Sequence, residues 1–370
     1  MIKFAGLLLL SLVAFSPAEA GVNVTEISQC PTLSPRTPPT SVHDLRADDI
    51  KVIGALGDSI TAGFGIMGLN TSLPLIAAMS AAFKEYRGLS YSAGGDAGAF
   101  TVPNYIKHYQ TNLTGYSVGS HLPERCHATS CNAFYLPNKD ELNAAQSGAI
   151  ARNLDHQLDY LLERIKFVEG VDYGNDWKMI NIQIGSNDMC GACNSSYIND
   201  TTPEVFGNYV EAAVERIRNG IPKVLVNLVG TFNVSQLFPL RAGQSYCLPS
   251  NNTDETLCPC ATTPGGLEKI GNLNLAYNQK LVDIYKKYQK NKTDNFTVIY
   301  QQSNINITGF PIDFFSNIDC FHPGLKGHQW ISKILWNQFF VPQYLKPTVF
   351  NFNENETIYC PVDSDRIATN

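Results

Sequence analysis

Short apolar runs alternate with long amphipathic runs through most of the chain, and this alternation constrains the fold more than any other feature. The short runs have the composition of buried strands, and the long runs repeat their apolar residues with the period of a helix. The strand-like runs are 51–57, 141–148, 177–188, 223–232 and 296–301, and the helical runs are 73–86, 150–168, 203–220, 267–289 and 327–340. The pattern predicts βαβ units, and therefore a three-layer α/β/α sandwich with a mainly parallel central sheet.

One domain is expected over residues 48–345, because no internal repeat and no linker rich in Gly and Pro interrupts that stretch. Residues 21–47 are rich in proline and lack apolar periodicity, so we expect an extended leader there. Residues 346–370 have little periodicity and are expected to form a C-terminal tail on the surface. Residues 240–265 combine cysteines with prolines, which is typical of a surface insertion held by disulfides.

The first twenty residues have the composition of a secretory signal peptide. Lys3 precedes an apolar run that begins at Phe4, and the small residues Ala18 and Ala20 predict cleavage after Ala20. No later segment contains the roughly 18 uninterrupted apolar residues that a membrane-spanning helix needs. We therefore expect a secreted protein without a transmembrane anchor, with the lysosome or another endomembrane lumen as the alternative location.

Ten cysteines and eleven glycosylation sequons follow the predicted cleavage point. An even number of cysteines fits complete pairing in an oxidising compartment, and many sequons behind a signal peptide predict a glycoprotein. The sequons begin at Asn23, Asn70, Asn112, Asn194, Asn199, Asn233, Asn251, Asn291, Asn295, Asn306 and Asn355.

Cysteine spacing also suggests a structural role for the pairs. Cys190 and Cys193 form a C-x-x-C pattern, which we interpret as a structural disulfide, because a zinc site would need a second pair of ligands. We further expect Cys126 with Cys131, Cys247 with Cys258 or Cys260, a disulfide at Cys320, and anchoring of the leader and the tail by Cys30 and Cys360.

The formal net charge of −6 argues against two classes of partner. A negative chain without a cluster of Lys and Arg is a poor ligand for nucleic acid and for anionic membranes. Electrostatic attraction alone is therefore not expected to hold the substrate.

Polar side chains follow several predicted strands at the point where each strand ends. Ser59 follows the first strand, Gly148 follows the strand that holds 142–144, and Asn187 follows the third. Asp319 and His322 precede the last helix. Since sites in open α/β sheets form beyond the carboxyl ends of the strands, we expect these residues to lie together.

The residue types in this set suit acyl transfer to a serine. A serine hydroxyl needs an adjacent base, and the base needs a third group that holds its tautomer. The three-residue spacing lets Asp319 reach Nδ1 of His322 while Nε2 faces Ser59. Charge that develops on the substrate carbonyl oxygen needs hydrogen-bond donors, for which we expect the backbone amides of Ser59 and Gly148 and the side-chain amide of Asn187.

Four blocks of the sequence resemble the ordered blocks of the SGNH hydrolases, also called GDSL lipases. They are GDSITAG at 57–63, the stretch 143–148, GSND at 185–188, and the D-x-x-H of Asp319 and His322. The chain is most similar to the secreted phospholipase B group, in EYRGLSYSAGGDAG, IKHYQTNLTGYSVG, LNAAQSGAIARNL, IGSNDMCGAC and DCFHPGLKGH.

This resemblance implies a function and a set of roles. It implies calcium-independent hydrolysis of phospholipid and lysophospholipid acyl esters without metal or cofactor, and transient contact with a membrane or micelle surface. It implies Ser59 as nucleophile, His322 as base and Asp319 as its orienting acid, with Gly148 and Asn187 as oxyanion donors.

Other interpretations remain open. On the same scaffold the chain could be an esterase of carbohydrates or other small esters, or a lipid-binding glycoprotein without turnover. The GGD at 94–96 is the alternative to Gly148 for the second block, and His328 is interpreted as a structural histidine. Four apolar residues after the nucleophile are candidates for an acyl groove or for a loop that covers the sheet edge: Phe64, Ile66, Met67 and Leu69.

Overall fold

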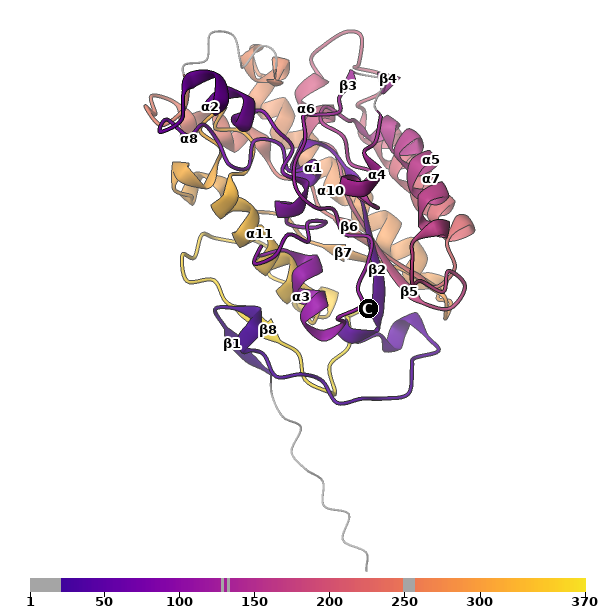
Figure 1. Ribbon diagram of the computed structural model, residues 1–370. Coiled ribbons are helices and arrows are strands. Elements are labelled where there is room, and N and C mark those ends of the chain that lie inside the picture. Colours follow the sequence, from indigo (N-terminus) through magenta and orange to yellow (C-terminus); the bar gives the residue numbers. More distant parts are fainter. Residues whose placement is uncertain (1–20, 128–129, 132–133, 249–256) are drawn as a thin grey trace, which may run out of the picture.

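A four-stranded parallel sheet forms the centre of the protein (Figure 1). Its strands follow the order β2 (Ile50–Gly57), β5 (Trp177–Gln183), β6 (Val224–Val229) and β7 (Phe296–Gln301). The computed structural model describes residues 21–127, 130–131, 134–248 and 257–370. The predicted signal peptide and the sequon at Asn251 lie outside these ranges.

The helices and strands follow the expected alternation, with several short elements between them. The strands are β1 (Val22–Val24), β2 (Ile50–Gly57), β3 (Cys126–His127), β4 (Ser130–Cys131), β5 (Trp177–Gln183), β6 (Val224–Val229), β7 (Phe296–Gln301) and β8 (Ile358–Cys360). The helices are α1 (Ser59–Ala62), α2 (Leu75–Ala82), α3 (Val102–Tyr109), α4 (Pro137–Asp140), α5 (Leu154–Arg164), α6 (Ser186–Gly191), α7 (Pro203–Gly220), α8 (Leu237–Arg241), α10 (Gly266–Lys290) and α11 (Leu325–Gln338).

Helices cover both faces of the sheet, and the strand order explains their distribution. The order advances in one direction at every step, so crossovers of the same hand place α5, α7 and α10 together on one face. Helix α11 packs with α3, and the two lie together in Figure 1 on the other face. Every pairing in the sheet is parallel, which confirms the predicted three-layer α/β/α class.

The strands supply the centre of the hydrophobic core. Every residue of β5, β6 and β7 is buried, as expected for parallel strands covered on two faces. The buried side chains of these strands join those of the covering helices in one continuous cluster.

The stretch 142–144 differs from its prediction as a full strand. It pairs with β2 at a single bridge, between Ala55 and Asn143, where the Ala55 N–H donates to the Leu142 carbonyl over 3.0 Å. Glu141 has a φ of 49°, and the Asn143 side chain accepts from the Ala145 N–H, so the chain turns on both sides of this bridge. These turns limit the pairing and direct the next residues across the sheet edge.

The leader and the tail pair with each other below the amino-terminal ends of the strands (Figure 1). Strand β1 is antiparallel to β8, and a disulfide joins Cys30 to Cys360. Ile358 and Ile367 are buried, so part of the tail belongs to the core, in contrast to the expected surface position.

Five disulfides use all ten cysteines, and their pairing corrects part of the expectation. The predicted disulfide between Cys126 and Cys131 is confirmed. The predicted partner of Cys247 was wrong, because Cys247 pairs with Cys320. The two cysteines of the C-x-x-C pattern form structural disulfides, but not with each other: Cys190 pairs with Cys258 and Cys193 with Cys260.

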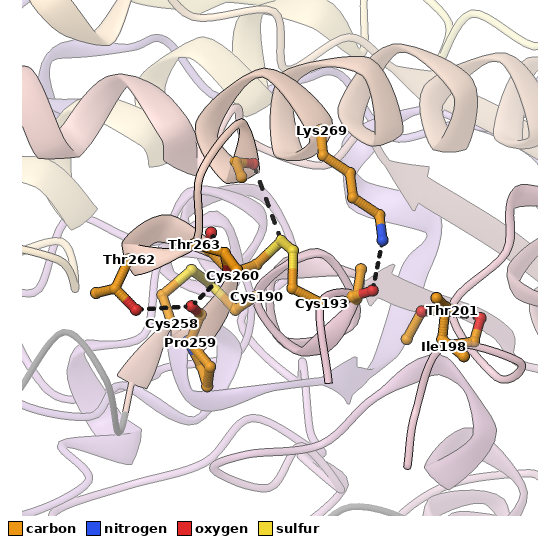
Figure 2. Close-up of a disulfide and its surroundings, with 12 residues drawn as sticks. Cys190, Cys193, Ile198, Thr201, Cys258, Pro259, Cys260, Thr262, Thr263 and Lys269 are labelled. Carbon is orange, nitrogen blue, oxygen red and sulfur yellow. Dashed lines mark hydrogen bonds between the residues drawn. A yellow bond between two sulfur atoms is a disulfide. The ribbon is translucent and has the colours of Figure 1, made fainter. Parts of the chain in front are cut away.

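These last two disulfides fasten α6 to the segment that precedes α10 (Figure 2). Both C-x-x-C sulfurs project from the end of α6 toward the turn at Pro259–Thr262. Lys269 of α10 donates from Nζ to the carbonyl of Ala192 over 2.7 Å and adds a third contact. Helix α6 is therefore fixed at its carboxyl end.

Removal of the disulfide between leader and tail is expected to destabilise the fold. The Cys30→Ser/Cys360→Ser variant should lose about 2–4 kcal/mol of unfolding free energy, because this bond closes a very long loop in the unfolded chain. Guanidinium unfolding without reductant measures the loss. The matched control is Cys126→Ser/Cys131→Ser, whose bond has a sequence separation of 5. An equal or larger loss in this control would contradict the prediction.

Candidate active site

Ser59 lies at the turn between β2 and α1, at the carboxyl edge of the sheet. Asp58 caps the helix, and its Oδ1 accepts from the Ile60 N–H over 2.9 Å. Gly63 ends the helix with a φ of 80°, and a Cβ there would lie 2.6 Å from the Tyr86 carbonyl oxygen. The small residues of the motif therefore allow a one-turn helix that presents the serine at its start.

Ser59, His322 and Asp319 form a chain of hydrogen bonds. The Ser59 Oγ lies 2.8 Å from Nε2 of His322, and Nδ1 of His322 lies 2.7 Å from Oδ2 of Asp319. All three side chains are buried to more than nine-tenths of their surface. The structure thus brings the predicted serine, imidazole and carboxylate together, although 263 positions separate Ser59 from His322.

A tight loop fixes the position of the Asp319 carboxylate relative to the His322 imidazole. Oδ1 of Asp319 accepts from the N–H groups of Phe321 and His322 over 2.9 and 3.1 Å. Cys320 occupies the left-handed region at φ 46°. Its disulfide to Cys247 attaches the loop to the segment that follows α8. The rings of Phe64 and Phe321 flank His322, at 4.9 and 5.2 Å between centroids.

The ionised form of Asp319 is favoured in spite of burial. Burial alone would raise the pKa of this carboxyl, but the charge and the hydrogen bond of His322, with the two loop N–H groups, outweigh it and leave the pKa below 3.8. Asp319 therefore remains an acceptor for Nδ1 of His322 and fixes the tautomer that leaves Nε2 facing Ser59.

Gly148 and Asn187 lie at the same pocket as Ser59. Gly148 has a φ of 81°, and a Cβ there would lie 2.5 Å from the Cys126 carbonyl oxygen, so only glycine fits. Asn187 sits in the first turn of α6, and its Nδ2 donates to the Ala149 carbonyl over 2.9 Å. Within the described residues, no hydrogen bond uses the backbone N–H of Ser59 or Gly148.

The pocket at Ser59 has a volume of about 280 Å³. Its wall includes His322 and Phe64, whereas the other three candidates for an acyl groove do not line it. The GGD at 94–96 is also absent from this wall. The structure therefore places Gly148, and not the alternative glycines, beside the serine.

His328 has the environment of a structural histidine. It is 1 % exposed, and its Nδ1 accepts from the Tyr91 N–H over 3.1 Å. Burial lowers its pKa to about 3, so the ring is neutral.

A buried network of charges supports the Gly148 stretch, and the sequence interpretation missed it. Glu85 and Arg87 are fully buried and pair at 2.7 Å, and Arg87 also lies 3.3 Å from Asp140. Glu85 accepts from the Ser147 hydroxyl over 2.6 Å, while Arg87 donates to the Asn143 carbonyl over 3.0 Å. The signal in the sequence was a group of three charged residues, Lys84, Glu85 and Arg87, after a stretch without ionisable side chains at 64–83.

Part of this network has the composition of a cation site. Ligand atoms of His121, Glu124 and Asp140 lie within 4.8 Å of one another. Asp140 already accepts from Nε2 of His121 over 2.8 Å and contacts the Arg87 guanidinium. Arg87 thus supplies positive charge at the place where an ion would sit, and the geometry is explained by ion pairing.

Comparisons with known proteins agree with this geometry. The sequence model of the GDSL-like lipase/acylhydrolase family matches residues 53–335. The chain belongs to this family. Membership makes it an ester hydrolase of the serine type, and residues 53–335 include all five predicted site residues.

Two curated relatives of this acylhydrolase are named "Phospholipase B1, membrane-associated". The mouse protein is 32% identical over 338 residues and the human protein is 32% identical over 340 residues; each alignment covers 88% of this chain. The chain spans about a fifth of the length of these relatives, 21% and 22%. None of the helices that the structure describes has the length and hydropathy needed to cross a bilayer.

Solved structures also resemble this acylhydrolase. A GDSL-like lipase from Parabacteroides merdae aligns with a TM-score of 0.42 and 16% identity, over 78% of this chain and 94% of that one. An extracellular lipase from Streptomyces rimosus aligns with a TM-score of 0.33 and 13% identity, over 75% and 94%.

Asp58 gives the acylhydrolase a pH-dependent stability. Burial raises the pKa of this carboxyl from 3.8 to about 6, and within the described residues its Oδ2 has no hydrogen-bond partner. The unfolded chain therefore releases this proton at lower pH than the folded chain does. The free energy of unfolding therefore falls as the pH rises from about 4 to about 6. The loss is about 3 kcal/mol, because the pKa differs by about two units between the folded and the unfolded chain.

The Asp58→Asn variant should remove this loss, because asparagine is neutral and keeps an oxygen that accepts from the Ile60 N–H. The unfolding free energy of the variant minus that of wild type should therefore be about 3 kcal/mol larger at pH 7.5 than at pH 4. Urea unfolding at both pH values measures the difference. A difference that does not change with pH would contradict the buried, neutralised state of Asp58.

Proposed function

We propose that the chain is a calcium-independent phospholipase B with lysophospholipase activity, which hydrolyses acyl esters of phospholipids through Ser59, His322 and Asp319. The hydrogen-bond chain from Ser59 Oγ through the imidazole to the Asp319 carboxylate is the observation that carries the proposal. This arrangement is the one that activates a serine hydroxyl at neutral pH.

Ser59 acts as the nucleophile in the first half of the reaction. Its Oγ forms a bond to the acyl carbon as the proton passes to Nε2 of His322. The tetrahedral intermediate then collapses, the bond to the alkoxy oxygen breaks, and His322 gives its proton to that oxygen. The products are a lysophospholipid, or the deacylated glycerophosphodiester, and an acyl ester of Ser59.

Water completes the reaction with the same groups. His322 takes a proton from water, whose oxygen attacks the acyl-enzyme, and the fatty acid leaves as Ser59 recovers its proton. Asp319 orients the imidazole and stabilises its charged form in both halves. A phospholipase B repeats this cycle on the remaining acyl ester.

Gly148, Asn187 and Ser59 supply donors for the oxyanion. Ser59 and Gly148 border the pocket, and no hydrogen bond among the described residues uses their backbone N–H groups. The second N–H of the Asn187 amide is not used by its bond to Ala149. Donors that are preorganised in this way stabilise the charge that develops on the carbonyl oxygen.

The pocket at Ser59 is the place for the acyl chain. Phe321 also lines a second, apolar cavity with Ile60 and Trp330, whose volume is about 40 Å³. That is room for about three water molecules at ~10–15 Å³ each. The pocket at Ser59, at about 280 Å³, is the larger space, and the rings of Phe64 and Phe321 provide it with apolar surface.

We further propose that α2 touches the lipid surface that presents the substrate. No ionisable side chain occurs in residues 64–83, and four large apolar side chains of this region are exposed by more than two-fifths: Met67 49%, Leu73 43%, Leu75 72% and Ile76 86%. An exposed apolar surface of this kind is typical of an interaction site.

A lipid surface fits α2 better than a protein partner, because α2 is continuous with the active site. Ala82 at its end packs against Phe64, and Phe64 contacts the His322 ring. The ester of a phospholipid lies at the boundary of the bilayer, so the mouth of the pocket must reach that boundary. An uncharged apolar rim suits a zwitterionic surface and does not need anionic lipid.

The location proposed for this enzyme is extracellular or in an endomembrane lumen. Five disulfides are typical of an oxidising compartment, and the sequons that follow the predicted signal peptide fit the same route.

Loss of the nucleophile or the base should abolish hydrolysis. Wild type is expected to release both acyl chains from a mixed-chain phosphatidylcholine in the presence of a calcium chelator. Ser59→Ala and His322→Ala should each lower kcat by about 10⁴-fold or more, because the hydroxyl and the base act as a unit. Mass spectrometry of the released fatty acids and lysolipids measures the rates.

The control for this experiment is Ser28→Ala, which changes an exposed serine near β1 and should leave the rate unchanged. Near-wild-type hydrolysis by Ser59→Ala would contradict the mechanism. Hydrolysis of acetylated sugars without any action on phospholipids would indicate the small-ester esterase instead. Failure of the folded wild type to react with a serine-directed phosphonate would indicate a binding protein without turnover.

The contact of α2 with lipid predicts a selective defect. Leu75→Ser/Ile76→Ser should lower hydrolysis of phosphatidylcholine vesicles about tenfold or more, since partial burial of the two side chains in lipid contributes about 1 kcal/mol each. Hydrolysis of a water-soluble short-chain ester should not change. Vesicle co-sedimentation and both rates are measured in an Asn70→Gln background, so that no glycan at that sequon holds α2 away from lipid.

Leu275→Ser is the matched control, because Leu275 on α10 is 67% exposed. This variant should keep the vesicle rate. Equal vesicle rates for wild type and the α2 variant would contradict the proposal. Loss of a wild-type dimer in the α2 variant would show that α2 binds a second copy of the chain, and would also contradict it.

A further inference from the structure

The pocket at Ser59 has two chemically different sides. Phe64 and Phe321 line it next to His322, and both present aromatic rings. Arg125 and His127 line it next to Gly148. One side therefore offers apolar surface to a substrate, and the other offers a permanent positive charge.

Arg125 is held at a fixed place relative to the oxyanion donors. It forms a parallel bridge with Ser147, and the Cys126 N–H donates to the Ser147 carbonyl over 2.8 Å. The Cys126–Cys131 disulfide closes the strand pair that follows, and the Cys126 carbonyl fits against the bare Cα side of Gly148. The backbone of Arg125 thus lies opposite Ser147, the residue that precedes Gly148.

Arg125 differs from the other arginines in the contacts of its guanidinium. Within the described residues, it forms no ion pair and no hydrogen bond, and its side chain is exposed. The other arginines are engaged: Arg36, Arg46, Arg87, Arg152, Arg164, Arg216, Arg218 and Arg366 pair with acids, and Arg241 donates to the Asp319 carbonyl.

Among the described residues, no acid pairs with Arg125. Glu124 precedes it in the chain, but the ligand atoms of Glu124 lie with those of His121 and Asp140 in the buried network. Within the part of the chain that the structure describes, the pocket therefore contains a cation without an ion-pair partner, next to Gly148.

We propose that Arg125 binds the phosphate of the substrate headgroup. The inference rests on the proposed phospholipase function and adds the residue that distinguishes a phospholipid from a neutral ester. In a glycerophospholipid the phosphate is separated from the acyl esters only by the glycerol carbons. With the ester carbonyl at Ser59 and Gly148 and the acyl chain against Phe64, the phosphate lies toward Arg125.

The chemistry of the two groups supports this assignment. A guanidinium donates two parallel N–H bonds to the oxygens of one phosphate, and the charge strengthens both. A phosphodiester and a guanidinium both keep their charges near neutral pH, so recognition there does not depend on titration. The pocket thus orients the substrate by its charge at one end and by its chain at the other.

The experiment compares two lipids that differ in the headgroup alone. Wild type, Arg125→Ala and Arg125→Lys are assayed on phosphatidylcholine and on diacylglycerol with the same acyl chains, in the same detergent micelles. Arg125→Ala should lower kcat/KM for phosphatidylcholine about 10- to 100-fold, the effect of a lost hydrogen bond to a charged group, and leave diacylglycerol unchanged. Arg125→Lys should retain part of the preference for phosphatidylcholine over diacylglycerol. Lysine keeps the positive charge but cannot donate two parallel hydrogen bonds to one phosphate.

Arg218→Ala is the matched control, since Arg218 lies on α7 and pairs with Glu215. It should not alter the ratio of the two rates. An unchanged ratio in Arg125→Ala, whether both rates fall together or neither changes, would overturn the assignment of Arg125. Absence of phosphatidylcholine hydrolysis by wild type that still cleaves diacylglycerol would overturn the proposed function itself, so the two failures are distinguishable.

Discussion

The hydrogen bond between Ser59 and His322 joins the two ends of the catalytic domain, and the surrounding structure holds it. The serine begins a one-turn helix after the edge strand of the sheet, whereas the histidine belongs to a loop before the last helix. A contact of 2.8 Å across that distance needs both segments to be rigid. Asp58 and Gly63 fix the first segment, and the Cys247–Cys320 disulfide with the Asp319 side chain fixes the second.

The oxyanion side depends on a different interaction, the buried pair of Glu85 and Arg87. Taking such a pair out of water is costly, and a buried ion pair is weak evidence for stability. Here the pair has a positional role, because Arg87 binds the Asn143 carbonyl and Glu85 binds the Ser147 hydroxyl. The two contacts hold both ends of the stretch that leads to Gly148. Loss of Arg87 would remove the buried cation that Glu85 and Asp140 share.

Predictions from the sequence succeeded where the signal is local and periodic. The helix expected over 203–220 is present with the same bounds, because Thr202 caps it and its apolar residues repeat with the helical period over five turns. The stretch 142–144 has the composition of a strand but makes one bridge only, since turns on both sides stop the pairing. Disulfide partners were mostly missed, because spacing along the chain carries little information about which loops meet.

The sequence by itself determined the α/β class and the residues of the candidate site, since both motifs are short and ordered. The motif at 57–63 follows a predicted strand, and the motif at 319–322 precedes the last helix. The tertiary structure alone decided what surrounds them. Nothing local marks Arg125 as part of the pocket, or joins Glu85 to Ser147 over 62 positions. These contacts arise because separate loops converge on one edge of a parallel sheet, and their distances depend on packing between segments that are remote in the chain.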